Sequence, residues 1–501
     1  MQSPPESPAI QDILSGLNPP QVEAVTSVFD RHCLVLAGAG CGKTSVLTRR
    51  IAFCAITHCS QDKILALTFT RKAAEEMRLR VLELPGIRKD LGPPVITTFH
   101  GFGLSILRDT VNGIANSSRL GYSGEPKLLS SEDRLMALAL SSTSPERQAL
   151  GVDLFKLDDL LARHAVQSPR LQNLVAEKQA ILGEIAGRFS RLKIDKNVWE
   201  FSDMITRALE LCDRFPEIEQ HYASRFKSVL VDEFQDTNPL QIRLLKKLLG
   251  GGTKLMAVGD DDQAIYGFRG ADAGPTLDFT SHFNDAAIVK LETNYRSRPA
   301  ILRAANRIFG NKPAAYRKIL RSGKYASAGK ERGNKPVRRL CATQREMVTW
   351  VLSEAQRTSR ATGIPVDAMC MLFRLNETCD WTRECLANSV PAGIPVPRLM
   401  TIHGSKGLEF PVVFLCDLEE SVLPNYRRRH AATIRGWGDL CARVFAGRGR
   451  DDNGLDLPEE MRLFYVGVTR AQERLYLVSA RSKQSLGRSV TFRPSRFLRM
   501  L

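Results

Sequence analysis

A glycine-rich loop between an apolar run and a helical pattern constrains this chain more than any other feature. The run Cys33–Ala37 predicts a short strand, residues 38–44 read Gly-Ala-Gly-Cys-Gly-Lys-Thr, and a helical pattern follows over Ser45–Ala55. Glycines let a loop fold its main-chain amides around phosphate oxygens, and the following helix adds the positive end of its dipole. The sequence therefore predicts a phosphate-binding loop, and the alternative is a glycine-rich turn that binds nothing.

Two polar side chains at the end of the loop have expected roles. Lys43 is expected to reach the β- and γ-phosphates of a nucleotide, and Thr44 to hold Mg²⁺. The first position of the GxxxxGK[ST] pattern is alanine, a departure from the strict form. The residues expected to bind nucleotide in and beside this loop are Ala37, Gly38, Ala39, Gly40, Cys41, Gly42, Lys43, Thr44 and Ser45.

A second apolar strand ends in carboxylates. Residues 228–237 read Ser-Val-Leu-Val-Asp-Glu-Phe-Gln-Asp-Thr, and Asp232 follows Lys43 by 232 − 43 = 189 residues. Asp232 is expected to bind Mg²⁺ through water, and Glu233 to accept a proton from the water that attacks the γ-phosphate. The alternative is that these acids only cap the end of the strand. Together with the loop, they predict an enzyme that hydrolyses a nucleoside triphosphate.

The segment Asp-Glu-Phe-Gln-Asp-Thr-Asn at 232–238 resembles the UvrD/Rep/PcrA branch of helicase superfamily 1A. Other segments resemble the family's Q motif and its motifs Ia, Ib, III, IV, V and VI, in this order: Leu17–Val25, Ile64–Met77, Thr97–His100, Val258–Ala271, Leu291–Ser297, Met400–Phe410 and Arg462–Ala471. The resemblance implies an ATP-dependent 3′ to 5′ DNA helicase or translocase that uses ATP and Mg²⁺. Its implied roles are DNA repair, recombination or replication.

The resemblance also assigns residues around the nucleotide. Gln21 would recognise the adenine, Tyr295 would stack on it, and Glu409 would meet the sugar and phosphate region. Gln263 would sense the γ-phosphate, while two arginines of the second domain would act as arginine fingers. The residues implied to be catalytic are Lys43, Asp232, Glu233, Gln263, Arg296 and Arg470.

Aromatic rings beside basic side chains predict contact with single-stranded DNA, because any base can stack on a ring. The candidate rings are Phe69, Phe99 or His100, Tyr266 and Phe268. By resemblance, Phe69, Tyr266 and Phe268 line the path of the strand, with Arg269 and Lys72 near its backbone. The alternative for each ring is an ordinary place in the core. Phe268 stands where the family usually has Trp, Arg71 where it usually has Asn, and Ser45 where it often has Arg. These departures predict altered affinity with catalysis retained.

The resemblance implies an α/β fold with two RecA-like P-loop NTPase domains and a helical insertion. We expect the first domain at 1–108 and 195–285, the insertion (1B) at 109–194, and the second domain at 286–501. Family members usually carry another insertion, 2B, between motifs IV and V. Here Gly393–Val396 runs into motif V with only Pro397 and Arg398 between them, so 2B is predicted to be absent near 397–398.

Composition limits the class of partner. The net charge of +17 favours a polyanion, here single-stranded DNA and duplex junctions, because released counterions drive association with phosphates. The longest apolar runs are too short for a membrane span, and the acidic, proline-containing N-terminus lacks the pattern of a secretory signal, which predicts a cytoplasmic protein without membrane contact. The eleven cysteines contain no CxxC pair and predict reduced thiols.

Three interpretations remain open at this level. The first is an autonomous helicase. The second is a DNA-sensing ATPase that works with a separate nuclease or repair partner, as in compact UvrD-like subunits of phage-defence systems such as Gabija; the missing 2B insertion favours it. The third and weaker one is an RNA-directed motor.

A basic stretch at 426–450 has two interpretations. It is either a solvated loop or a segment that binds duplex DNA or a protein partner.

Overall fold

The computed structural model divides the chain into two compact units. The first comprises Met1–Leu36 and Lys43–Lys290, and the second comprises Ala37–Gly42 and Leu291–Leu501. The phosphate loop therefore begins in one unit and ends in the other. The residues that the structure describes are 7–26, 30–88, 90, 93–165, 174–250, 252–267, 274–310, 317–324, 335–391, 393–425, 457–485 and 488–501.

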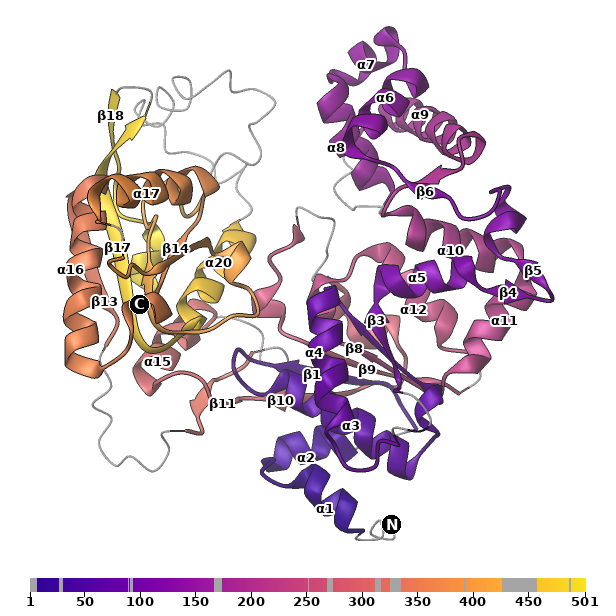
Figure 1. Ribbon diagram of the computed structural model, residues 1–501, viewed down its shortest axis with the longest axis horizontal. Helices are drawn as coiled ribbons and strands as arrows, with labels where there is room; N and C mark the ends of the chain where they lie inside the picture. The colour runs from indigo at the N-terminus through magenta and orange to yellow at the C-terminus, as the bar shows by residue number, and fades with distance from the viewer. Residues whose placement is uncertain are drawn as a thin grey trace. The chain divides into compact units, whose positions relative to one another are not determined.

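A six-stranded sheet forms the centre of the first unit (Figure 1). Its strand order is β10-β1-β9-β8-β2-β3. Neighbouring strands from β1 to β3 are parallel. The strands are β1 (Cys33–Ala37), β2 (Ile64–Thr68), β3 (Val95–Thr98), β8 (Ser228–Val231), β9 (Lys254–Gly259) and β10 (Ala287–Leu291). Every residue of β1, β2 and β8 is buried, as continuous apolar strands require when helices cover both faces of a parallel sheet.

Helices surround this sheet. They are α1 (Pro8–Leu14), α2 (Pro19–Thr26), α3 (Lys43–Thr57), α4 (Arg71–Leu82), α5 (Phe99–Arg108), α10 (Asp203–Arg214), α11 (Pro216–Arg225), α12 (Pro239–Leu248), α13 (Gly274–Leu277) and α14 (Phe279–His282). α5 and α10 cross at very close range, because a Cβ on Gly103 would lie 2.1 Å from the carbonyl oxygen of Met204. Glycine at this position lets the two backbones touch.

A largely helical segment separates α5 from α10 in the chain. Its elements are β4 (Thr110–Val111), β5 (Ile114–Ala115), β6 (Lys127–Leu128), α6 (Ser131–Ser141), α7 (Ser144–Leu150), α8 (Leu154–Ala165), α9 (Ala176–Asp195) and β7 (Val198–Trp199). Buried leucines, among them Leu138, Leu157 and Leu182, form a core of its own. The buried ammonium of Lys193 pairs with Asp203, 2.6 Å away, which ties the end of α9 to the start of α10.

The second unit contains a second sheet (Figure 1). Its strand order is β13-β17-β16-β14-β15, with β18 paired to β17. All pairs are parallel except β17 with β18. Its strands are β13 (Val337–Thr343), β14 (Cys370–Phe373), β15 (Arg398–Thr401), β16 (Phe410–Leu415), β17 (Ala471–Ser485) and β18 (Arg488–Thr491). The predicted α/β class with two mainly parallel sheets is confirmed.

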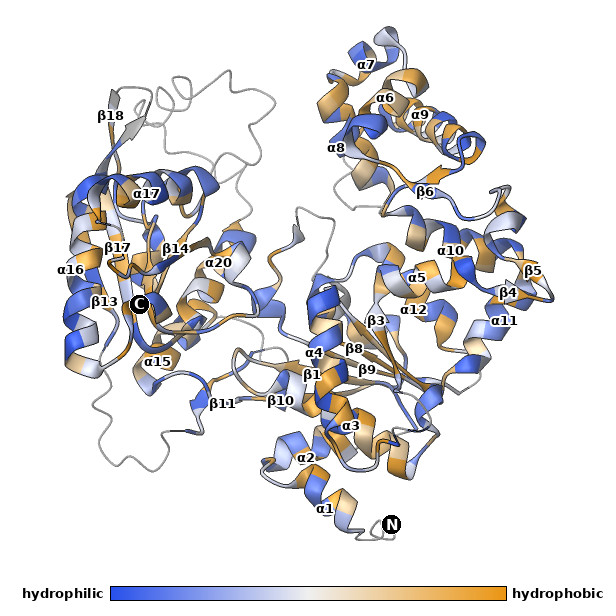
Figure 2. Cartoon of the chain, in the orientation of Figure 1, coloured by the Kyte–Doolittle hydropathy of each residue, from blue (hydrophilic) through white to orange (hydrophobic). Residues whose placement is uncertain are grey.

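In the described part of the second unit, the α-helices are α15 (Pro299–Ile308), α16 (Gln344–Thr362), α17 (Asn376–Ser389) and α20 (Leu457–Thr469). A short parallel pair, β11 (Thr293–Asn294) with β12 (Arg321–Ser322), lies near its start. Buried side chains of α16, including Met347 and Val351, pack on the sheet, and Figure 2 shows α16 with both hydrophobic and hydrophilic residues along its length. Residues 390–397 alone connect α17 to β15. Within the described residues, no helix is both long and apolar enough to span a bilayer.

Candidate active site and nucleic-acid interface

The phosphate loop follows the predicted strand and precedes the predicted helix. β1 ends at Ala37 and α3 begins at Lys43, so the loop amides precede a helix of 15 residues. Gly40 and Gly42 have φ values of +68° and +83°, in the left-handed region that favours glycine. The local fold of this loop therefore depends on the glycines from which it was predicted.

Lys43 and Glu233 meet although they lie far apart in the chain. The Lys43 Nζ is 3.2 Å from the Glu233 Oε2, and the two side chains are only 13% and 26% exposed. β8 ends one residue before Asp232, and the Glu233 that follows has a φ of +49°. The main-chain amide of Glu233 donates to the Asp232 Oδ1 at 2.9 Å. The structure thus brings three of the predicted catalytic residues to one point of the first unit.

Burial and neighbouring charges shift the pKa values of Lys43 and Asp232. Burial disfavours the Lys43 cation, but the carboxylates of Glu233, Asp260 and Asp232 outweigh it and raise the pKa of Lys43. Burial, followed by the negative charge of Glu233, raises the pKa of Asp232 to about 7, although Lys43 partly offsets this. Lys43 is therefore held as a cation, whereas burial and the neighbouring Glu233 disfavour the charged form of Asp232.

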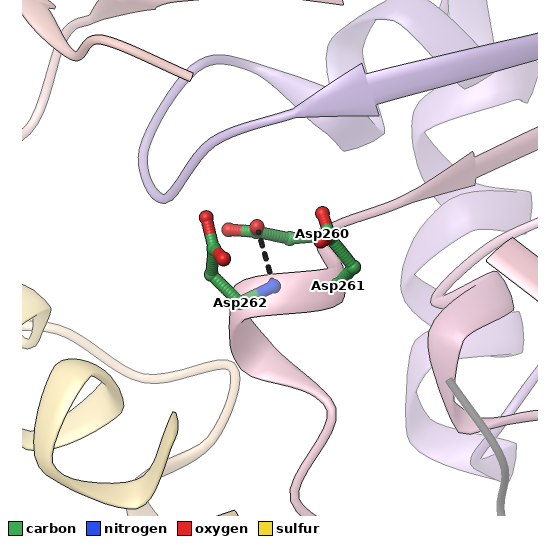
Figure 3. A group of neighbouring side chains, drawn as sticks. All are labelled: Asp260, Asp261 and Asp262. Atoms are coloured by element: carbon green, nitrogen blue, oxygen red, sulfur yellow. Dashed lines mark hydrogen bonds between the residues drawn. The ribbon is translucent and has the colours of Figure 1, made fainter. Parts of the chain in front are cut away.

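Three consecutive aspartates follow β9. Figure 3 shows Asp260, Asp261 and Asp262 side by side, and one carboxylate oxygen of each lies within 4.8 Å of the others. The Asp260 Oδ1 accepts from the amide of Asp262 at 3.2 Å, and its Oδ2 accepts from the Gln263 Nε2 at 2.6 Å. Gln263, the predicted γ-phosphate sensor, is thus held by Asp260.

Gln235 connects the two acidic segments and is not among the residues predicted from the sequence. Its Nε2 donates to the Glu233 Oε2, and its Oε1 accepts from the amide of Asp260 at 2.9 Å. The side chain is fully buried. A Cβ on Gly259 would lie 2.7 Å from the Gln235 Oε1, so glycine there leaves room for the amide. Only the tertiary structure reveals this bridge, because nothing in the local pattern says where the side chain points.

Gln21 lies at the beginning of α2 and is almost fully buried. Its amide donates to the Asn18 Oδ1 at 3.0 Å, and its Oε1 accepts from the amide of Asn18 at 3.1 Å. This reciprocal capping box fixes the predicted adenine-recognising side chain at the helix N-terminus.

In the second unit, the predicted arginines lie in polar networks. Arg296 donates to Glu409 and to the carbonyl oxygen of Thr469 at 3.2 Å. Arg470 is only 2% exposed and donates to the carbonyl oxygens of Val466 and Leu408, at 3.2 and 3.1 Å. Arg296 and Glu409, predicted from separate motifs, therefore form one ion pair.

Tyr295 is suited to stacking because its ring is accessible. The residue is 41% exposed. A Cβ on Gly323 would lie 2.9 Å from an atom of the Tyr295 ring, so the backbone of that glycine packs directly on the ring. This contact orients the ring that the sequence predicts to meet the adenine.

Two pairs of rings mark the predicted path of DNA in the first unit. Phe69, after β2, and Tyr266 stack with their centroids 5.2 Å apart and their planes at 16°. His100 and Phe201 stack with centroids 4.0 Å apart and planes at 25°. Phe201 is 51% exposed, and the sequence had not assigned it a role.

The remaining predicted DNA residues differ in what the structure says of them. Phe99 is buried, with 2% exposure, so of the two alternatives in motif Ib the structure favours His100. Burial lowers the pKa of His100 to about 4, and its ring is therefore neutral at physiological pH. Lys72 is exposed in the first turn of α4. Phe268, Arg269 and the basic stretch at 426–450 lie outside the described residues.

Comparison with known families accounts for most of the chain. The family model described as the UvrD/REP helicase N-terminal domain matches residues 17–284. The model described as the UvrD-like helicase C-terminal domain matches residues 289–396 and 394–482, in two segments that meet near 394–396. Most strands of both sheets therefore fall within matched regions, and β18 lies beyond them.

Individual relatives are similar over different shares of their length. The ATP-dependent DNA helicase UvrD1 of Mycobacterium tuberculosis (strain H37Rv) is 33% identical over 96% of this chain and 62% of its own. DNA helicase II of Escherichia coli (strain K12) is 39% identical over 60% of this chain and 41% of its own. A probable DNA helicase of Mycoplasma pneumoniae is 30% identical over 97% of this chain and 87% of its own. The chain thus spans less than two thirds of the mycobacterial and E. coli proteins.

Proposed function

The chain belongs to the UvrD/Rep helicase family, and from that premise we propose that it hydrolyses ATP to move along single-stranded DNA in the 3′ to 5′ direction. At duplex junctions this movement separates the strands, in DNA repair, recombination or replication. The observation that carries the proposal is the ion pair between Lys43 and Glu233. It supports a site in which a phosphate-binding cation and a proton acceptor act on the same phosphate group.

In the proposed reaction, a water oxygen bonds to the γ-phosphorus while the bond to the bridging oxygen of ADP breaks. Glu233 takes a proton from that water. Its Oε2 is bonded to Lys43 and Gln235, so a triphosphate that attracts the Lys43 ammonium frees the carboxylate for this role. Gln263, Arg296 and Arg470 are assigned from family resemblance to sensing and stabilising charge on the γ-phosphate.

The oxygen donors also fit Mg²⁺, which binds carboxylates and phosphates. The Thr44 hydroxyl and the Asp232 carboxylate are the residues proposed to hold the ion, and the ion would neutralise charge on the phosphates. The position of Asp232 supports this assignment, because it directly follows β8 and is adjacent to Glu233, which pairs with Lys43.

The rings of the first unit support contact with single-stranded DNA. The exposed face of Phe201, and the pair of Phe69 with Tyr266, offer platforms on which any base can stack. Such contacts contribute about 1–3 kcal/mol per base without reading sequence. Together with the net charge of +17, they favour a strand-tracking protein over one that recognises a sequence.

The test measures ATP hydrolysis and strand separation in the same samples, using duplexes with a 3′ or a 5′ single-stranded tail. Wild type should show DNA-stimulated hydrolysis and unwinding from the 3′ tail. Glu233→Gln should lose about 10²–10⁴-fold in kcat, as expected for a general base. Glu184→Gln, whose carboxylate is 72% exposed on α9, is the control that should keep full activity. Full turnover by Glu233→Gln would refute the assignment of the base.

A second candidate is a DNA-sensing ATPase that works with a separate nuclease in a phage-defence complex. The short connection at 390–397 favours it, because it leaves no room between α17 and β15 for the 2B insertion, which contacts duplex DNA in the family. DNA-stimulated hydrolysis without unwinding, together with stable co-purification of a nuclease, would support this function. Competition between DNA and RNA strands in the ATPase assay separates both candidates from an RNA-directed motor.

A further inference from the structure

In the phosphate loop, the main chain of Gly38–Gly40 is hydrogen-bonded to the segment that precedes Arg296, and both stretches belong to the second compact unit. The amide of Gly38 donates to the carbonyl oxygen of Leu291 at 3.1 Å, and the amide of Tyr295 donates to the carbonyl oxygen of Gly40 at 2.9 Å. Between them, the Asn294 Nδ2 donates to the carbonyl oxygen of Ala39 at 2.6 Å. Three successive loop residues are thus held by one short segment.

Asn294 uses the two ends of its amide for different tasks. Its Nδ2 holds the loop, whereas its Oδ1 accepts from the amides of Arg296 and Ser297, at 2.9 and 2.7 Å. The residue is only 1% exposed. A hydrogen bond of this kind is costly to lose, because the carbonyl oxygen of Ala39 would remain buried without its donor. One side chain therefore connects the loop to the turn that carries Arg296.

Close packing makes this connection stiff. A Cβ on Gly40 would lie 2.7 Å from the Cβ of Arg296 and 2.7 Å from the Asn294 Nδ2. On its far side the turn is anchored, since the Ser297 hydroxyl donates to the carbonyl oxygen of Ala471 at 2.6 Å. A shift of the loop main chain cannot be absorbed by empty space and must move the turn.

We propose that Asn294 is a positioning residue that transmits the state of the phosphate loop to Arg296 through its side-chain amide. The inference rests on the proposed ATPase function and on the role assigned there to Arg296. Asn294 touches no substrate in this scheme. It sets where Arg296 stands when the γ-phosphate is transferred, so its loss should act on the rate of hydrolysis more than on nucleotide binding, for which Lys43 and the loop amides remain.

The substitution Asn294→Asp tests the donor end of the Asn294 amide apart from its acceptor end. The variant keeps an oxygen for the amides of Arg296 and Ser297, but it cannot donate to Ala39. We expect kcat to fall about 10²-fold, as for a catalytic group misplaced by about 1 Å, while KM for ATP changes less than about threefold. Asn294→Ser, which is uncharged and whose single hydroxyl is too short to bond Ala39 and the turn at once, tests the same connection if the aspartate variant does not fold.

The matched control is Asn116→Asp. Asn116 is also fully buried and its Nδ2 donates to a main-chain carbonyl, that of Ile106 at 2.8 Å, in the first unit. This variant should lose stability in thermal unfolding and keep its kcat in ATP hydrolysis without DNA. A similar loss of kcat in both variants would show that burial of a carboxylate, and not the loop contact, causes the effect.

A double variant decides whether Asn294 acts through Arg296. In an Arg296→Ala background, Asn294→Asp should cause no further loss of kcat, because the group that it positions is gone. Losses that multiply in the double variant, or an unchanged kcat in Asn294→Asp alone, would overturn the inference. If wild type itself fails to hydrolyse ATP, the proposed function fails, and this outcome is distinct from both.

Discussion

Gln235 determines how two acidic segments of the site are spaced, since its amide bonds Glu233 on one side and Asp260 on the other. Gln235→Glu would keep the shape of the side chain but replace the donor with a second carboxylate beside Glu233. We expect kcat for ATP hydrolysis to fall about 10²-fold, with a smaller change in KM, because repulsion displaces or protonates the base.

Steady-state ATPase kinetics with saturating single-stranded DNA measure this effect. Gln179→Glu, at an exposed position of α9, makes the same chemical change away from the site and should keep the wild-type kcat. If Gln235→Glu also turns over at the wild-type rate, the amide does not position Glu233.

His100 makes stability depend on pH. Burial lowers its pKa to about 4 in the folded chain, against an ordinary value of 6.5. The unfolded chain therefore binds the proton more readily, and the contribution of His100 to the free energy of unfolding is constant above about pH 6.5 and falls as the pH drops from 6.5 towards 4. Urea unfolding at pH 7.5 and 5.0 should show a smaller acid-induced loss for His100→Phe than for wild type. Equal losses in the two proteins would contradict a half-buried imidazole that stays neutral.

Among the elements, those with strong local signals could be predicted from the sequence. The apolar run and the glycines give β1 and the loop, and β8 ends directly before the predicted carboxylates. The positions of Gln235 and Phe201 could not be predicted, because their partners Asp260 and His100 are distant in sequence and only packing brings them together. Local periodicity specifies an element but not the side chains that another element places against it.

The crossing of α5 and α10 illustrates this limit and can be tested. Gly103→Ala would place a Cβ 2.1 Å from the carbonyl oxygen of Met204, which is backbone and cannot rotate away. We expect the free energy of unfolding to fall by about 1–3 kcal/mol, as in other overpacked cores. His100 lies on α5, so single-stranded DNA affinity should fall as well.

Chemical denaturation of Gly103→Ala beside Gly183→Ala makes the comparison direct. Gly183 lies within α9, and a Cβ there would meet nothing within 4 Å. The control should therefore gain about 0.5–1 kcal/mol from better helix propensity. If Gly103→Ala loses no stability while Gly183→Ala does, the close crossing of α5 and α10 is not present in solution.

At the scale of the whole molecule, the net charge and the aromatic rings predict different effects of salt on DNA affinity. The net charge of +17 implies that affinity for a 20-nucleotide single strand falls linearly with salt on logarithmic axes, with a slope of about −0.7 per phosphate contact. The slope should be the same for strands of different sequence, because phosphates carry no sequence information. Fluorescence anisotropy at KCl concentrations from about 50 to about 300 mM measures this slope, because the Debye length falls by roughly half over that range.

Two variants separate the contributions. Phe201→Ala should weaken binding by about 1–3 kcal/mol at every salt concentration and leave the slope unchanged, since stacking releases no counterions. Lys72→Ala should weaken binding most at low salt and make the slope shallower by about 0.7, the loss of one phosphate contact. Phe155→Ala, a ring 73% exposed on α8, is the control for nonspecific loss of an aromatic surface. Only a cation at a phosphate releases counterions. A shallower slope in Phe201→Ala would therefore refute a pure stacking role for Phe201, and an unchanged slope in Lys72→Ala would refute a phosphate contact by Lys72.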